Sequence, residues 1–64
     1  MRNSLADLRA EHGLSQAALA EALDVSRQTI ISIERGRFDP SLPLAFKIAA
    51  HFERRIEEIF EPGD

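Results

Sequence analysis

The sequence contains no cysteine, tryptophan or tyrosine, and only three glycines and three prolines among its 64 residues. Without cysteine, neither a disulfide framework nor a thiolate metal site can supplement the core, and the chain fits a reducing compartment. The two histidines, His12 and His51, lie far apart with no second histidine or cysteine near either, so we expect no metal site. A chain this short forms at most one domain, which we place at residues 1–64.

Long apolar runs are also missing. None approaches the ~20 residues that a membrane helix needs, and no apolar stretch follows Arg2 to make a signal peptide. We therefore expect a cytoplasmic protein without a membrane partner. The serines form no readable nucleophile–base pair, and Glu57 and Glu58 would point about 100° apart on a helix. We expect no enzyme, no cofactor and no small-molecule effector.

The formal net charge is −3, which taken alone argues against a polyanionic partner. The distribution of charge matters more. Residues 1–37 carry five arginines against five acids, whereas residues 38–64 carry three bases against six acids. Because the excess acid lies in the C-terminal part, the N-terminal part can present a basic face if its acids point elsewhere.

Strand signals are absent, and apolar residues recur at helical spacing along the chain. The pattern predicts five helices: from about residue 3 to 12, 16–23, 27–35, 42–52 and 56–60. Ser15, Ser26 and Ser41 stand where N-caps belong, and Gly13 and Gly36 where helices end. Short helices with tight connections predict an all-α bundle.

The predicted core follows the apolar stripe of each helix. From the first three helices we assign to it Leu5, Leu8, Ala18, Leu19, Ala22, Leu23, Ile30 and Ile33. From the last two we assign Leu42, Leu44, Ala45, Phe46, Ile48, Ala49, Phe52 and Ile59. We expect phenylalanines to be core residues, with Phe38 or Phe60 available for a subunit contact.

The segment from Ser15 to Gly36 consists of two short helices joined by a tight turn, each opened by a serine. This arrangement is typical of a helix-turn-helix, whose second helix enters the major groove of DNA. With Ile30 and Ile33 turned inward, five residues of that helix face outward: Arg27, Gln28, Ile31, Ser32 and Arg35.

Arginine and glutamine on this face can bond guanine and adenine edges bidentately, and serine can serve either kind of edge. Ile31 is apolar on a polar face; it either touches a thymine methyl group or is a third core residue beside Ile30. Gln16 opens the second helix, where free backbone N–H groups favour an anion. It is either a phosphate contact or a solvated polar residue.

Three runs of the sequence resemble the phage Cro and repressor-like helix-turn-helix proteins, the Xre family. They are Leu-Arg-x-x-x-Gly-Leu-Ser-Gln-x-x-Leu-Ala-x-x-Leu (8–23), Val-Ser-Arg-Gln-Thr-Ile-x-x-Ile-Glu-x-Gly (25–36) and Asp-Pro-Ser-Leu-x-Leu-Ala-Phe-Lys-Ile-Ala (39–49). The resemblance implies a five-helix lambda-repressor-like fold whose helix-turn-helix is formed by helices 2 and 3. It also implies sequence-specific binding of double-stranded operator DNA, usually as a homodimer.

The resemblance further implies roles for individual residues. Base contacts fall on Arg27, Gln28 and Ser32, with Ser26 close by. Phosphate contacts fall on Ser15, Gln16, Arg35 and Arg37. Arg9 is expected to pair with Glu34; the alternative is that both are solvated surface charges.

We therefore expect a transcriptional regulator, a repressor, bound as a homodimer to an imperfect palindrome. The dimer contact is expected at the fifth helix, with Ile56 and Phe60 as candidates. The alternative is a protein-interaction module or an antitoxin of the same fold. Such a module has no need of the polar face on the third helix, so that face favours DNA.

Three departures from the family pattern bear on stability. Asp24 stands where the family usually has glycine, although aspartate tolerates a left-handed backbone better than most residues. Ala17 and Ala18 replace the usual glutamates, so the second helix has no capping box. The segment 53–55 replaces Gly-Val-Ser and leaves the last helix without a good N-cap.

Overall fold

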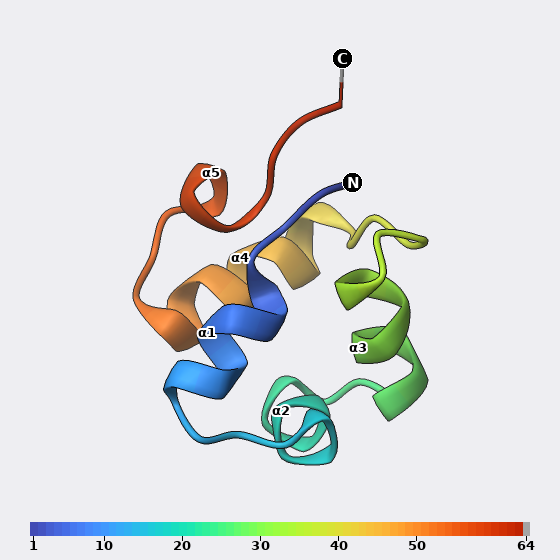
Figure 1. Ribbon diagram of the computed structural model, residues 1–64, viewed down its shortest axis with the longest axis vertical. Helices are drawn as coiled ribbons and strands as arrows, with labels where there is room; N and C mark the ends of the chain where they lie inside the picture. Colours follow the sequence, from blue (N-terminus) through green and yellow to red (C-terminus); the bar gives the residue numbers. More distant parts are fainter. Residues whose placement is uncertain (64) are drawn as a thin grey trace.

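The computed structural model describes residues 1–63, and this part of the chain folds into five helices (Figure 1). They are α1 (Leu5–Glu11), α2 (Gln16–Leu23), α3 (Arg27–Glu34), α4 (Leu42–Phe52) and α5 (Ile56–Ile59). The predicted all-α, five-helix architecture is confirmed. No helix among these residues is long and apolar enough to span a membrane.

The three predicted serine N-caps all form. The hydroxyl oxygens of Ser15, Ser26 and Ser41 each accept a hydrogen bond from the backbone N–H three residues further along, at 3.0, 3.1 and 3.3 Å. Each such cap stabilises its helix by about 1 kcal/mol. These caps explain why α2, α3 and α4 begin at the predicted residues.

Two non-glycine residues end helices in the left-handed conformation. Asp24 has φ 58° at the end of α2, and Glu53 has φ 54° at the end of α4. In this conformation the Cβ atom of an L-residue lies too close to the following carbonyl oxygen. Each of the two residues therefore carries a strain of roughly 1–2 kcal/mol. At the following helix, the Glu58 carboxylate accepts from the Arg55 backbone N–H at 2.8 Å. This bond caps α5, which the sequence had left without a good N-cap.

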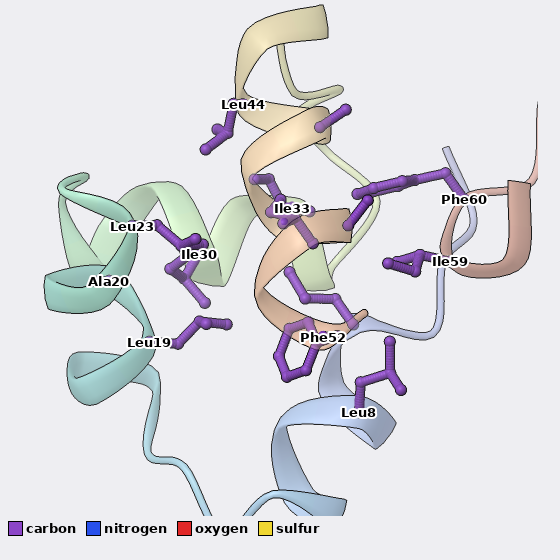
Figure 2. Close-up of a cluster of buried hydrophobic side chains, with 14 residues drawn as sticks. Leu8, Leu19, Ala20, Leu23, Ile30, Ile33, Leu44, Phe52, Ile59 and Phe60 are labelled. Atoms are coloured by element: carbon purple, nitrogen blue, oxygen red, sulfur yellow. The ribbon is translucent and has the colours of Figure 1, made fainter. Parts of the chain in front are cut away.

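One core lies between the helices, and Figure 2 shows its side chains gathered around α4. Leu19, Leu23 and Ile30 approach α4 from one side, and Ile59 and Phe60 from the other. The completely buried members are Leu5, Leu19, Ile30, Ile33 and Ile48. Since residues from every helix share this core, the positions of α2 and α3 depend on all five.

Two predicted core stripes were wrong by a rotation about the helix axis. In α2, Ala18 and Ala22 are exposed, and Ala20 is buried beside Leu19 and Leu23. In α4, the buried stripe runs through Leu44, Ala45, Ile48, Ala49 and Phe52. Leu42 and Phe46 lie on a neighbouring ridge and are 64% and 58% exposed. No described element covers that ridge.

The two ends of the described chain pair with each other, which the sequence analysis did not predict. Asn3 and Phe60 form an isolated antiparallel bridge. The Ser4 N–H donates to the Ile59 carbonyl at 2.9 Å, and the Glu61 N–H donates to the Arg2 carbonyl at 2.8 Å. Asn3 therefore lies in an extended segment, and α1 begins at Leu5 rather than at the predicted Asn3.

Candidate nucleic-acid interface

Helix α3 lies at one edge of the molecule, with α2 packed against it and the core behind it (Figure 1). Ile30 and Ile33 are fully buried, which leaves the opposite side of α3 free. Arg27, Gln28 and Arg35 on that side are exposed. The side chains singled out from the sequence thus share one accessible surface, which we call the α3 face: Arg27, Gln28, Ile31, Ser32 and Arg35.

The positive charges of this region are not neutralised by the protein. Among residues 1–63, Arg27, Arg35 and Arg37 make no ion pair. Gln28 Nε2 donates one long hydrogen bond, of 3.5 Å, to the Ser32 Oγ one turn away, which leaves the second amide N–H and the serine O–H unused by this bond. The donors of the α3 face therefore remain available to an outside partner.

Ile31 is half-buried but lies outside the core. The partly buried apolar side chains that pack on the core are Leu14, Val25 and Ile56, and Ile31 is not one of them. Of the two interpretations left open by the sequence, the structure therefore does not support a third core residue beside Ile30.

Phe38 follows α3 in the loop to α4 and is 46% exposed. With four polar residues it lines a shallow depression of about 150 Å³ beside the α3 face; these residues are Ser26, Gln28, Thr29 and Ser32. The expectation of a core phenylalanine is wrong here. Sequence reasoning did not place Phe38 beside the α3 face because a loop has no periodicity from which to read a direction.

The start of α2 offers a second set of donors. Ser15 is exposed, and its hydroxyl oxygen accepts from the Ala18 N–H while its own hydrogen stays available. The first backbone N–H groups of a helix have no partner inside it, and the helix dipole favours an anion there. This helix end therefore carries donors of the kind that bind an oxyanion.

Arg9 and Glu34 lie together between α1 and α3. The Arg9 Nε donates to Glu34 Oε2 at 2.7 Å, and its Nη2 donates to Oε1 at 3.3 Å. The two side chains are only 20% and 8% exposed. The hydrogen bonds that Arg9 donates to Glu34 raise the pKa of the Arg9 guanidinium further, so this side chain stays charged.

Two further bonds extend the pair into a network. The Arg9 Nη1 donates to the Leu14 carbonyl at 2.9 Å, just before the Ser15 cap. The Gln16 Nε2 donates to Glu34 Oε1 at 3.1 Å. Gln16 is therefore not a freely solvated residue, because its side-chain amide is hydrogen-bonded to the last residue of α3.

The described residues hold no group of three or more histidine, cysteine, aspartate or glutamate side chains that could bind a metal ion. They also leave no buried side-chain donor or acceptor unpaired. What the structure presents is a polar, cationic helix face beside a helix N-terminus.

Two short helices joined by a left-handed turn, the second with an exposed polar face, define a helix-turn-helix protein. The helix-turn-helix family model matches residues 5–59, and the chain belongs to this family. Its relatives are transcriptional regulators rather than enzymes.

Three relatives illustrate the match. An HTH-type transcriptional regulator of Methanocaldococcus jannaschii is 60% identical over 60 residues, covering 94% of this chain and 91% of the relative. Another from Methanothermobacter thermautotrophicus is 51% identical over 61 residues, covering 94% and 88%. The crystal structure of the restriction-modification controller protein C.AhdI from Aeromonas hydrophila has a TM-score of 0.78 at 34% identity, covering 88% of this chain and 85% of that one.

Proposed function

We propose that this protein is a sequence-specific regulator of transcription that inserts α3 into the major groove of duplex DNA. The observation that carries the proposal is the α3 face, where exposed donors stand on a helix whose other side is fully buried. The major groove is about 12 Å wide and accepts one helix. The base contacts we propose come from the N-cap and exposed side of α3: Ser26, Arg27, Gln28, Ile31 and Ser32.

Phosphate contacts flank these base contacts in the proposal. At the start of α2, the Ser15 hydroxyl, the Gln16 amide and free backbone N–H groups suit one phosphate. Just after the C-terminal end of α3, Arg35 and Arg37 suit further phosphates, since neither is paired within residues 1–63. Such contacts fix the register of the protein on DNA without reading its sequence.

Phe38 adds an apolar contact to this proposal. Its ring borders a depression lined by Gln28 and Ser32, beside the groove-facing side of α3. The one apolar group that a base pair presents in the major groove is the thymine methyl, and phenylalanine is among its partners. We assign Phe38 to such a methyl group, and Ile31 to a second one.

We further propose that the protein binds as a two-fold dimer through an apolar groove between α4 and α5. The groove has a volume of about 420 Å³ and is lined by Met1, Pro40, Leu42, Ala45, Ile56, Glu57, Phe60 and Pro62. Leu42 projects beside it with 64% of its surface exposed, and Ile56 is half-buried. Phe60, by contrast, is only 4% exposed, so it supplies the floor of the groove rather than a projecting contact.

The size of the molecule supports a second copy as the occupant of this groove. The chain measures 31 × 22 × 20 Å. The recognition helices of a dimer must lie ~34 Å apart to enter successive major grooves on one side of the duplex. In a two-fold dimer, equivalent points are separated by twice their distance from the axis, so a molecule of this size can hold α3 at half of the required separation from the axis.

The charge distribution fits the same arrangement. Among residues 1–63, Glu57 is the only charged side chain that lines the groove, and its own backbone N–H and then Arg55 lower the pKa of its carboxyl group. The groove is thus an apolar surface with one ionised acid. In the dimer, the acidic C-terminal part would be turned away from the phosphates.

The operator of such a dimer is an imperfect palindrome with half-site centres about 10 base pairs apart. A small dimer that covers an operator excludes other proteins from it, so we propose repression as the mode of action. We propose the cytoplasm as its location. A protein partner in place of DNA, as for an antitoxin, would use the exposed ridge of Leu42 and Phe46.

Selection of bound sequences from a random duplex pool tests the proposal. We expect an enriched palindrome of the stated spacing. Arg27→Ala should lose the base preference at one position of each half-site, whereas Arg54→Ala is a matched control that should keep it, since Arg54 is an exposed arginine in the turn before α5. No enrichment by the wild type, or equal loss in both variants, would contradict sequence-specific binding through α3.

A further inference from the structure

A chain of hydrogen bonds links the proposed phosphate contact to the far end of α3. Gln16, the first residue of α2, donates from Nε2 to Glu34 Oε1 at 3.1 Å. Glu34 is the last residue of α3, and its other oxygen accepts from Arg9 Nε at 2.7 Å. The Gln16 amide, which we assign to a phosphate, is therefore held by the Glu34 carboxylate, and Arg9 holds that carboxylate in turn.

We propose that Glu34, neutralised by Arg9, is a positioning residue that orients the Gln16 amide toward a DNA phosphate. This inference rests on the proposed function. A glutamine amide has two N–H donors. One of them is used by Glu34, so the direction of the second is fixed before DNA arrives, and binding does not have to order a flexible side chain.

Arg9 makes this arrangement compatible with a polyanion. A bare carboxylate within hydrogen-bond reach of Gln16 would repel a phosphate at the same helix end. Two hydrogen bonds from the Arg9 guanidinium cancel that charge, and a third, to the Leu14 carbonyl at 2.9 Å, fixes the loop before the Ser15 cap. Arg9 therefore acts on the phosphate site through Glu34 and through this loop.

The test compares two variants that remove the same charge. Glu34→Gln keeps an oxygen that can accept from Gln16, whereas Glu34→Ala does not. Ordering one long side chain at an interface weakens binding by about three- to tenfold. We expect Glu34→Ala to bind duplex DNA about three- to tenfold more weakly than Glu34→Gln, equally on the selected operator and on unrelated duplexes, because phosphates carry no sequence.

A second pair of variants separates positioning from a general structural effect. In a Gln16→Ala background, the affinity ratio between Glu34→Gln and Glu34→Ala should fall to one. All affinities are measured at a temperature where circular dichroism shows each variant fully folded. If Glu34→Ala does not fold, Glu34→Asp serves instead: it keeps the wild-type charge but draws the carboxylate back from Gln16, and is compared with the wild type in both backgrounds.

The outcomes distinguish this inference from the proposed function. A ratio of one with Gln16 present, or a ratio that persists without Gln16, would overturn the positioning role while DNA binding stands. A wild-type protein that binds no duplex would instead refute the proposed function itself.

Discussion

Asn3 donates from its Nδ2 to the backbone carbonyl oxygen of Ile33 at 2.8 Å, across 30 positions of sequence. The same side chain accepts the Leu5 N–H through its Oδ1 at 3.1 Å, at the start of α1. One amide therefore connects the beginning of the first helix to the end of the helix that we propose reads DNA. The backbone around it is paired with the segment after α5.

Replacing Asn3 should loosen both helices at once. Asn3→Ala removes a helix-start acceptor, worth about 1 kcal/mol, and leaves a partly buried carbonyl without its donor, at about 1–3 kcal/mol. Urea denaturation should therefore show a loss of about 2–4 kcal/mol. Glu11→Ala, at an exposed position of α1, should change stability by less than about 0.5 kcal/mol. Similar results for the two variants would mean that Asn3 does not hold α3.

The starts of α2, α3 and α4 could be predicted because their causes are local. The N-caps are serine hydroxyls that bond the N–H three residues further along, at Ser15, Ser26 and Ser41. Gly13, just after α1, has the positive φ of 66° that is typical of a helix end. Each of these interactions lies within one helical turn of sequence. They can therefore be predicted from the order of the residues alone.

The side of a helix that becomes buried was less predictable, because it depends on neighbours that are distant in sequence. An alanine-rich helix such as α2 gives little contrast between its sides, so Ala18 and Ala22 were confused with Ala20. In α4, the apolar residues occupy a wider part of the helix surface than the neighbouring elements bury. Leu42 and Phe46 therefore remain exposed. The Asn3 bond to Ile33 had no sequence signal at all.

The proposed division between base and phosphate contacts predicts two kinds of loss. Arg27→Ala or Gln28→Ala should cost about 1–3 kcal/mol of discrimination at one base pair in each half-site. Arg35→Ala should weaken all duplexes about equally and reduce the salt slope of binding by about one. Binding titrations against all single-base variants of the operator, at two salt concentrations, measure both. A change of base preference in Arg35→Ala and none in Arg27→Ala would reverse the assignment.

The contact between Phe38 and a thymine methyl can be tested by removing single methyl groups from the DNA. Replacing each operator thymine in turn by deoxyuridine should weaken wild-type binding at two positions of each half-site and leave Phe38→Ala unaffected at one of them. Ile31→Ala should lose its sensitivity at a different position, because Ile31 lies on the α3 face and Phe38 in the following loop. If Phe38→Ala keeps the full deoxyuridine pattern of the wild type, its ring does not touch a methyl group.

The Arg9–Glu34 pair should also contribute to the stability of the free protein. Breaking a fully buried pair costs ~3–5 kcal/mol because one charge is stranded. Here the side chains are 20% and 8% exposed, so water reaches the stranded partner and we expect about 2–3 kcal/mol for either single alanine variant. In a double-mutant cycle, the loss in the double variant should be well below the sum of the single losses. Additive losses would show that the two side chains do not couple.

The dimer depends in our proposal on Leu42, which projects beside an apolar groove. Leu42→Glu places a charge there, and in a two-fold contact the same charge appears on the partner. Because Leu42 is 64% exposed in the single chain, its replacement should change the folding stability of the monomer little. Sedimentation should therefore show a folded monomer at concentrations where the wild type is a dimer. Binding to the palindrome should fall toward the level of a single half-site.

Ala50→Glu is the control, since Ala50 is also exposed on α4 but does not line the groove. A wild type that stays monomeric both free and on DNA would remove the dimer. A Leu42→Glu variant that still dimerises would move the contact to another surface.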